Sequence, residues 1–352
     1  MGRVRRPFQG LARATAAAKA PAPADGPEDS SMGIPNFMAA PVLEAPAPVA
    51  SRTGTVAPPP AAQASWQHQT VAPSSEPVAV AGAPAGAPAV ALDREVYFGD
   101  TRYPIYIRSG PAAWAEFAGL LTGLRADRFL LVTDDGVPAP ALQAVSRVLE
   151  ELAPVTVLRA PSNERAKTLS TIDDLAREAF TSGATRMSVF VALGGGLAGN
   201  VAGLLAHLFL RGARLVHVPT TLLAMSDSVL SLKQAVNSPV GKNHLGAFHA
   251  PELVWSQLDS LDTLPQSQVR AALCEAIKNV IAICPDRHDE LAARLRTDAV
   301  YSRAELAWFI GMCIDAKQQV MAADPQEKGR GLVLEYGHTV GHAAELVTGG
   351  RL

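Results

Sequence analysis

Residues 187–200 read MSVFVALGGGLAGN, an apolar run followed at once by a glycine turn. The run is typical of a buried strand, and Gly194, Gly196 and Gly199 have the spacing of a dinucleotide-binding fingerprint. In that fingerprint the glycines let backbone N–H groups approach a pyrophosphate, and an acidic residue about 20 positions later binds the ribose. Residues 211–226, RGARLVHVPTTLLAMS, contain no acidic residue. We therefore expect a strand, turn and helix that differ from a standard Rossmann site.

The sequence on both sides of this turn alternates between strand and helix patterns. From about residue 264 the pattern becomes helical, and Ser302 and Glu305 have the spacing of a capping box at the start of one helix. The fold prediction is α/β, with an N-terminal Rossmann-like nucleotide-binding domain over 93–262, an all-helical domain over 263–352 and a cleft between them. Strands are expected within 93–110, 127–137, 155–161, 187–193 and 213–219, and helices over 139–153, 169–182, 196–210, 265–283, 302–323 and 332–347.

Composition narrows the class of protein. The chain has 31 Lys and Arg against 33 Asp and Glu, a formal net charge of −2, which gives no sign of a nucleic-acid surface. Three cysteines without a CxxC pair argue against a disulfide framework and a thiolate zinc site, and they fit a cytoplasmic protein. No window has the roughly 20 uninterrupted apolar residues of a membrane span. Residues 1–92 hold 15 of the 27 prolines, which predicts a disordered Ala/Pro-rich extension.

Two helical segments carry candidate chemical groups. Glu335, His338 and His342 are three and four residues apart, so on one helix they would share a face. Such a face is either a metal or catalytic site or a solvated surface. Glu275 and Lys278 are also three residues apart, and they form either an intrahelical ion pair or a metal ligand beside an acid/base group.

Residues 219–251 form the densest polar stretch of the chain. Asp227, Lys233, Lys242 and Asn243 stand there among glycines and small residues. A loop of this composition can encircle an anion, and its cations suit a phosphorylated sugar and a cofactor pyrophosphate better than a plain surface charge run.

Five segments together resemble the dehydroquinate synthase-like sugar phosphate cyclases. The match spans about 95–352, and it is carried by ALGGGLAGNVAG (192–203), FLRGARLVHVPTTLLAMSDS (209–228), GKNHLGAF (241–248), CEAIKN (274–279) and EYGHTVGHAAE (335–345). The resemblance implies NAD and a divalent metal, zinc or cobalt, as cofactors, a phosphorylated sugar as substrate, and a homodimer. In this family NAD⁺ oxidises the sugar, the metal polarises the reacting hydroxyl, phosphate leaves, the hydride returns and an aldol step closes the carbocycle.

The resemblance also implies roles for individual residues. Glu335 would be the acid/base group, Lys233 would hold the phosphate, and Arg211 would reach across the dimer interface to the partner subunit's phosphate. Glu275 and His338 match metal ligands. The remaining catalytic positions are Lys278, His342, Asn243, Asp227 and Lys317, and the cofactor-binding positions are Asp134, Glu164, Lys167, Gly194, Gly195, Gly196, Asn200, Thr220, Thr221 and Lys242.

Three departures from the dehydroquinate synthases indicate a branch of the family. Asn200 replaces an aspartate, Glu335 replaces an asparagine, and Gly331 replaces the arginine that clamps a substrate carboxylate. These changes resemble the branch that converts glucose 6-phosphate to 2-deoxy-scyllo-inosose in aminoglycoside biosynthesis. Arg330 and Lys317 leave a carboxylated substrate open, so a 3-dehydroquinate synthase, a valiolone-type cyclase and a metal-dependent polyol dehydrogenase remain alternatives.

The family places a third metal ligand, a histidine in a His-Gly-Glu motif, downstream of the EYGHTVGHAAE helix. The sequence ends at Leu352 without this motif. Because a catalytic zinc site has three protein ligands, we expect a C-terminally incomplete helical domain, and an inactive truncated fragment is a further alternative.

Overall fold

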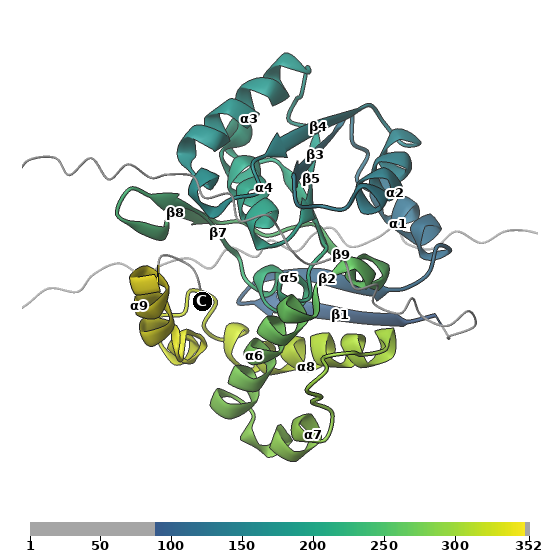
Figure 1. Cartoon of the computed structure of the whole chain (residues 1–352). Helices are drawn as coiled ribbons and strands as arrows, with labels where there is room; N and C mark the ends of the chain where they lie inside the picture. The colour runs from purple at the N-terminus through teal and green to yellow at the C-terminus, as the bar shows by residue number, and fades with distance from the viewer. Residues whose placement is uncertain (1–88, 349–352) are drawn as a thin grey trace, which may run out of the picture. The chain divides into compact units, whose positions relative to one another are not determined.

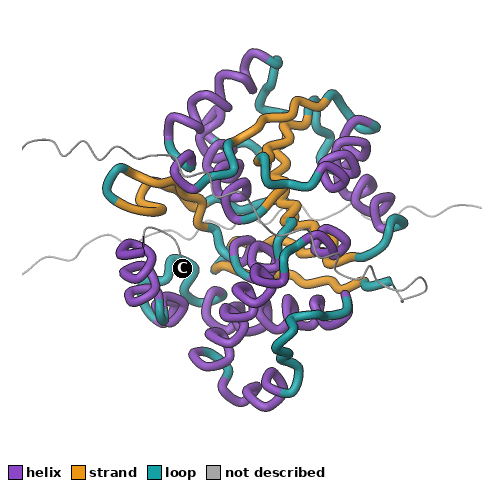
Figure 2. The backbone as a smooth tube through the Cα atoms, viewed as in Figure 1, coloured by secondary structure: helices purple, strands orange, loops and turns teal. Residues whose placement is uncertain are grey.

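The computed structural model of the chain describes residues 89–348, except for the side chains of His342, Glu345 and Leu346. The predicted extension therefore lies outside the described residues up to position 88. A seven-stranded sheet in the order β1-β2-β9-β6-β5-β3-β4 runs through the centre of this part (Figure 2). Strands β1 and β2 pair antiparallel, and every other pairing in the sheet is parallel. Its strands are β1 (Ala91–Phe98), β2 (Thr101–Arg108), β3 (Phe129–Asp134), β4 (Val155–Ala160), β5 (Val189–Gly194), β6 (Arg214–Pro219) and β9 (Leu253–Gln257).

Helices cover both faces of the parallel strands (Figure 1). Every residue of β3 is buried, and successive side chains alternate between faces: Leu130 packs with α3 and α4, whereas Leu131 packs with α1 and α2. This double burial explains why the strand begins with four consecutive apolar residues, Phe129 to Val132. The helices are α1 (Ala113–Thr122), α2 (Ala139–Glu150), α3 (Leu169–Thr181), α4 (Gly196–Leu208), α5 (Leu222–Ser226), α6 (Gln266–Ala282), α7 (His288–Ala292), α8 (Arg303–Met321) and α9 (His338–Thr348).

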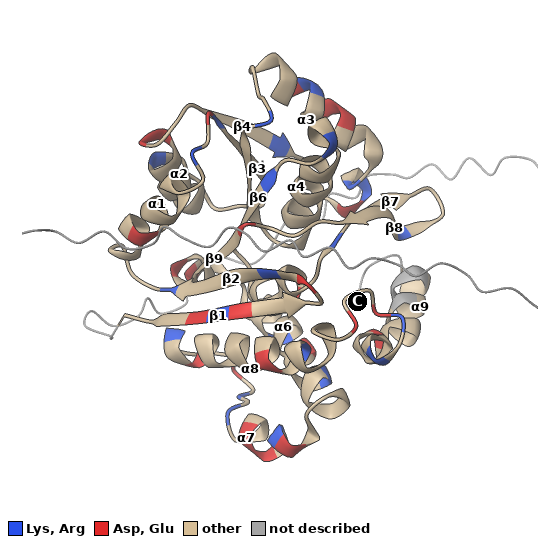
Figure 3. Ribbon diagram, turned by 180° about the vertical axis from the view of Figure 1, so that it is seen from behind, with Lys and Arg blue, Asp and Glu red and all other residues tan. Residues whose placement is uncertain are grey.

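The helices after the sheet pack directly against it. One hydrophobic cluster runs from Phe98 and Ile105, on β1 and β2, to Ala276 on α6 and Phe309 on α8. Strand β1 lies along α8 in Figure 3, and Arg94 on β1 pairs with Asp315 on α8 at 3.0 Å. The predicted capping box of Ser302 and Glu305 begins α8 and is confirmed. A boundary between domains at 262/263 stays a prediction.

The structure corrects two local predictions. The polar stretch expected as a loop contains a two-stranded antiparallel hairpin, β7 (Lys233–Ser238) and β8 (Gly241–Phe248), whose register pairs Lys233 with Phe248. The helix expected over 332–347 is interrupted. A 3-10 segment, Arg330–Glu335, precedes α9, and Gly337 between them has a φ of +86°, which ends the regular helical path.

Within the described residues, no helix combines the length and the apolar character that crossing a membrane requires.

Candidate functional site

The glycine turn, Gly194–Gly196, joins the end of β5 to the start of α4. Gly194 has a φ of +152°, and a Cβ there would lie 2.6 Å from the Cβ of Ala198. A Cβ on Gly195, the N-cap of α4, would lie 3.3 Å from Thr221. The turn thus tolerates no side chain at Gly194 and presents bare backbone at the N-terminus of a long helix. This cradle fits the pyrophosphate of a dinucleotide.

The ends of β3 and β6 lie on either side of the glycine turn. Thr220 donates from its backbone N–H to the Gly194 carbonyl over 2.9 Å. Asp134, the last residue of β3, accepts a hydrogen bond from the Gly136 N–H at 2.8 Å, and burial raises the pKa of its carboxyl. The predicted positions Asp134, Gly194 and Thr220 therefore meet at one edge of the sheet, where open α/β sheets bind ligands.

A second group of predicted residues joins the 3-10 turn Glu164–Ala166 to the hairpin. Lys167 donates from Nζ to Asn243 Oδ1 over 2.6 Å, and Asn237 donates from Nδ2 to Glu164 Oε1 over 2.9 Å. Lys167 is buried, which lowers the pKa of its ammonium group; Glu164 raises that pKa and Lys242 lowers it. Glu164, Lys167, Lys242 and Asn243, which the sequence assigns to cofactor and substrate, thus lie in one neighbourhood.

A polar cleft of about 520 Å³ lies beside the hairpin. Its walls come from α4, from β7 and β8, from α6 and α8, and from the segment that leads into α9. Segments far apart in the sequence therefore meet here, as the approach of α9 toward the hairpin in Figure 1 also shows. The polar residues in its lining are Asn200, Asp227, Ser228, Ser231, Lys233, Gln234, Asn243, His244, Lys278, Lys317, Glu327, Glu335 and His338.

One wall of the polar cleft holds a buried ion-pair network. Lys317 pairs with Asp227 and lies 3.1 Å from Glu275 Oε1, and Lys278 lies 2.9 Å from the same Glu275 oxygen. Lys278 also donates to the Leu334 carbonyl over 2.8 Å. Burial acts to lower the pKa of Lys317, but the two carboxylates outweigh it and raise this pKa above its ordinary value. The ion-pair interpretation of Glu275 and Lys278 is therefore the one that the structure shows.

A second group in the lining consists of Lys233, Glu327, Glu335 and His338. Lys233 Nζ lies 2.5 Å from Glu327 Oε2 and 3.5 Å from Glu335 Oε1, while the other Glu335 oxygen lies 2.5 Å from His338 Nδ1. Burial acts to raise the pKa of Glu335, but contacts with His338 and Lys233 outweigh it and lower that pKa. Glu335 is therefore ionised near neutral pH and can accept a proton. Sequence reasoning missed Glu327.

Two of the predicted catalytic residues are not in this cleft lining. Arg211 is exposed at the end of the 3-10 segment Phe209–Arg211 that follows α4, and no hydrogen bond or ion pair joins its side chain to the described residues. Leu210 and Arg211 have φ values of +51° and +70°, a strained backbone for two residues that are not glycine. The side chain of His342 lies outside the described residues.

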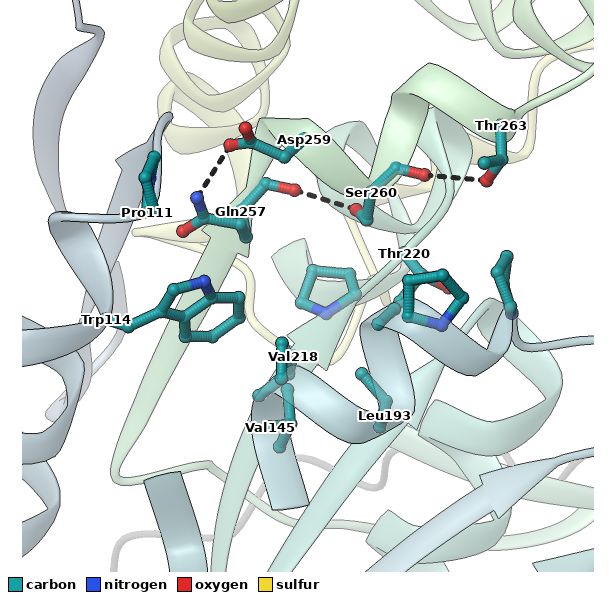
Figure 4. A pocket seen from close by; sticks show the side chains of 15 residues that line it. Pro111, Trp114, Val145, Leu193, Val218, Thr220, Gln257, Asp259, Ser260 and Thr263 are labelled. Atoms are coloured by element: carbon teal, nitrogen blue, oxygen red, sulfur yellow. Dashed lines mark hydrogen bonds between the residues drawn. The ribbon is translucent and has the colours of Figure 1, made fainter. Parts of the chain in front are cut away.

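An apolar pocket of about 210 Å³ lies at the carboxyl ends of β5, β6 and β9. Sequence reasoning missed it. Figure 4 shows Gln257, Asp259 and Ser260 along one side and Val145, Val218 and Leu193 along the opposite side. The pocket reaches Thr220 beside the glycine turn. Gln257 is 4% exposed and donates from Nε2 to Asp259 Oδ2 over 2.6 Å, whereas its buried Oε1 has no partner among the described residues. The proline pair Pro138 and Pro140, which follows β3, was the available sequence signal.

The described residues do not by themselves fit a metal ion. As far as side chains are described within 89–348, no group of three His, Cys, Asp or Glu could hold one. The predicted ligand Glu275 faces the ammonium groups of Lys278 and Lys317, and the predicted ligand His338 contacts Glu335. In this structure two ammonium groups therefore neutralise the Glu275 carboxylate.

Comparison with known proteins identifies similar sequences. Residues 157–271 match the 3-dehydroquinate synthase N-terminal family model, and residues 272–352 match the 3-dehydroquinate synthase C-terminal model. The chain is 48% identical over 247 residues to 2-deoxy-scyllo-inosose synthase of Streptomyces kanamyceticus, covering 70% of this chain and 63% of the relative. It spans less than two thirds of the length of the curated relatives it matches.

Solved structures share the fold. A crystal structure of 2-deoxy-scyllo-inosose synthase complexed with carbaglucose-6-phosphate, NAD⁺ and Co²⁺ superposes with a TM-score of 0.69 at 39% identity, over 73% of this chain and 71% of that one. The 2-epi-5-epi-valiolone synthase from Streptomyces hygroscopicus subsp. jinggangensis, with NAD⁺ and Zn²⁺ bound, gives a TM-score of 0.63 at 23% identity, covering 74% and 72% of the two chains. The second likeness concerns the fold alone.

Proposed function

The chain belongs to the 3-dehydroquinate synthase family, and we propose that it is a sugar phosphate cyclase that converts glucose 6-phosphate to 2-deoxy-scyllo-inosose with release of phosphate. The observation that carries the proposal is the meeting of Lys233, Glu335 and His338 in one wall of the polar cleft. A phosphate-binding cation and a proton acceptor there are close enough to act on one small substrate. The solved relative that is 39% identical is bound to carbaglucose-6-phosphate.

NAD is the proposed redox cofactor, and when bound it would accept a hydride from the sugar and return it. The glycine turn would hold its pyrophosphate through the backbone N–H groups at the start of α4. The apolar pocket, which adjoins Thr220, would take the adenine, with the unpartnered Gln257 Oε1 as an acceptor for an amino group. We propose Asp134, Glu164, Lys167, Asn200, Thr220, Thr221 and Lys242 as the other positions at or beside the cofactor.

Substrate would be bound and deprotonated by neighbouring side chains of the polar cleft. Lys233 would hold the phosphate, and the ionised carboxylate of Glu335 would accept a proton from the sugar and return it later. Asp227, Asn243, Lys278, Lys317 and His342 complete the proposed catalytic set. A divalent metal is the second proposed cofactor, on the strength of the 39% identical relative whose structure holds Co²⁺; Glu275 and His338 are the proposed ligands and would exchange their present ion pairs for it.

The loop around Gly331 favours a substrate without a carboxylate. Gly331 has no side chain to clamp one, and its backbone N–H and that of Gly329 already donate to Asp324 Oδ2 over 2.8 and 2.7 Å. A substrate carboxylate would therefore find no free donor at these two positions. This observation supports glucose 6-phosphate over the carboxylated substrate of a 3-dehydroquinate synthase.

We further propose an organisation in which residues 93–262 form the NAD-binding domain and residues from 263 form the metal and substrate domain. A homodimer, with Arg211 reaching the partner's phosphate site, and a cytoplasmic location belong to the same proposal. The exposure of Arg211 on its strained turn supports the proposed homodimer, because the side chain is accessible to a partner subunit.

The test is incubation of the chain with NAD⁺, Co²⁺ and individual sugar phosphates. We expect phosphate release from glucose 6-phosphate without accumulation of NADH, because the hydride returns to the product. Turnover of a carboxylated heptulosonate phosphate instead would indicate a 3-dehydroquinate synthase, and turnover of sedoheptulose 7-phosphate a valiolone-type cyclase. Net formation of NADH would indicate a polyol dehydrogenase.

A further inference from the structure

Glu327 is a buried carboxylate that faces the cation proposed to bind phosphate. Its Oε2 lies 2.5 Å from Lys233 Nζ, although the two residues are 94 positions apart. The Glu327 side chain is 7% exposed, whereas that of Lys233 is 43% exposed. Both residues line the polar cleft, and the Lys233 side chain is the more accessible of the two.

The backbone at Glu327 is strained. Its φ is +54°, in the left-handed region that glycine and asparagine tolerate best and a long side chain tolerates poorly. The Asp324 carboxylate holds this loop by accepting backbone hydrogen bonds from Lys328, Gly329 and Gly331 at 3.1, 2.7 and 2.8 Å. Strain of this kind persists where the side chain is needed at that place, because a glycine would remove it.

Gly331 makes room for this arrangement. A Cβ there would lie 2.9 Å from Asp324 Oδ2 and 3.1 Å from Cβ and Cγ of Glu327. Any larger residue at 331 would displace the Asp324 carboxylate or push Glu327 away from Lys233. The strained backbone at Glu327 and the absence of a side chain at Gly331 thus both favour the contact between Glu327 and Lys233.

The contact has two physical interpretations. If the contact is purely structural, it ties the loop to β7, and its loss would loosen the cleft and weaken the binding of every ligand. A competing anion would neutralise Lys233 before phosphate arrives, and its loss would strengthen phosphate binding, because the incoming dianion would no longer meet a like charge. The strain favours the second interpretation, because a neutral residue that tolerates a positive φ could tie the loop to β7 without this backbone strain.

We propose that Glu327 is a positioning residue that holds the Lys233 ammonium at the phosphate end of the cleft and competes with phosphate for it. The proposal rests on the proposed function, which assigns phosphate binding to Lys233. Its consequence is that the cleft holds a phosphate monoester firmly enough to orient it and releases inorganic phosphate readily.

The decisive variant is Glu327→Gln in the full chain, with inorganic phosphate as the probe in calorimetric titrations. We expect the Kd for phosphate to fall roughly fivefold, because the variant keeps the shape of the side chain and loses its charge. Glu116→Gln is the matched control, since Glu116 pairs with Arg108 at 2.7 Å outside the cleft lining, and it should leave this Kd unchanged. A Kd that rises or stays the same in Glu327→Gln overturns the proposal.

Glu327→Gly is a second variant that keeps the proposal testable if Glu327→Gln does not fold. Glycine relieves the positive φ, so this variant should melt at a higher temperature than the wild type and also bind phosphate more tightly. If Glu327→Gln does not fold, tighter phosphate binding in Glu327→Gly supports competition in its place. Because inorganic phosphate is the probe, this result does not depend on turnover of glucose 6-phosphate, so failure of the proposed function is seen separately. If neither the wild type nor the variants bind phosphate, the proposed role of Glu327 is wrong.

Discussion

Asn200 and Ala235 join the glycine turn to the hairpin. Asn200 Oδ1 accepts a hydrogen bond from the Ala235 N–H at 2.9 Å, and its Nδ2 donates to the Gly196 carbonyl at 2.8 Å. Both ends of one amide are therefore used, one on the first turn of α4 and one on β7. The residue that the sequence assigns to the cofactor acts, in this structure, as a link between the cofactor turn and the strand that carries Lys233.

Asn200→Asp tests this link because it keeps the acceptor and loses the donor. A carboxylate would face the Gly196 carbonyl oxygen, so we expect a loss of about 1–3 kcal/mol in the free energy of unfolding and weaker NAD binding. Urea denaturation and fluorescence titration with NADH measure the two effects. Asn163→Asp is the control, since aspartate can replace the Asn163 side chain as an N-cap. Equal effects of both variants would contradict the link.

Gly194→Ala tests the cradle of the glycine turn. The added Cβ would lie 2.6 Å from the Cβ of Ala198, so β5 and α4 must move apart. We expect a loss of about 2 kcal/mol or more in the free energy of unfolding and no measurable binding of NAD. Gly119→Ala in α1, where a Cβ would meet nothing within 4 Å, should be neutral or stabilising. Normal NAD affinity in Gly194→Ala would show that the cofactor lies elsewhere.

His217 makes stability depend on pH. Burial lowers its pKa to about 4, from 6.5 in the unfolded chain, and its Nε2 has no partner among the described residues. Between these values the unfolded chain binds more protons, so stability is fully present above pH 6.5 and falls as pH drops toward 4, by about 3 kcal/mol in all. The free energy of unfolding at pH 7 and at pH 5 measures this slope. His217→Leu should flatten it, and an unchanged slope would assign the effect to other groups.

Glu335→Gln tests the proton acceptor. The amide cannot take up a proton, so we expect kcat to fall by about 10²–10⁴-fold. Glu150→Gln, at the exposed end of α2, is the control and should keep normal kcat. A kcat near the wild-type value in Glu335→Gln would remove this residue from the proton-transfer step.

Arg211 provides a test of the proposed dimer. If it serves the partner's site, an Arg211→Ala chain and a Lys233→Ala chain would together rebuild one intact site in each mixed dimer. Random mixing of two inactive variants should then restore about a quarter of wild-type activity. Phosphate release from the mixture measures it, and no recovery after verified subunit exchange would favour sites built within one chain.

Much of the fold follows from the sequence because its signals are local. The apolar run before Gly194 and the Ser302–Glu305 pair each specify structure within a few residues, and both are confirmed. The break at Gly337 was missed because the apolar periodicity continues across it, and a glycine in a helical pattern does not reveal its φ.

The site was less predictable, since it depends on contacts between distant segments. Glu327 gives no sequence signal: its importance comes from a positive φ and from Lys233, 94 residues away. The hairpin was missed because polar strands that lie outside the main sheet lack the apolar alternation by which strands are recognised. The apolar pocket likewise forms only where the ends of β5, β6 and β9 come together.

The hairpin offers a way to read out both ligands with one label. It is tied to the glycine turn through Asn200 and to the 3-10 turn through Lys167, and it begins at Lys233. Its tip residue Val240 is 86% exposed and lies outside the lining of the polar cleft. An environment-sensitive dye on a cysteine at position 240, in a chain whose exposed Cys274 is replaced by serine, would therefore report movement of the hairpin when dinucleotide or phosphate binds, with no turnover needed.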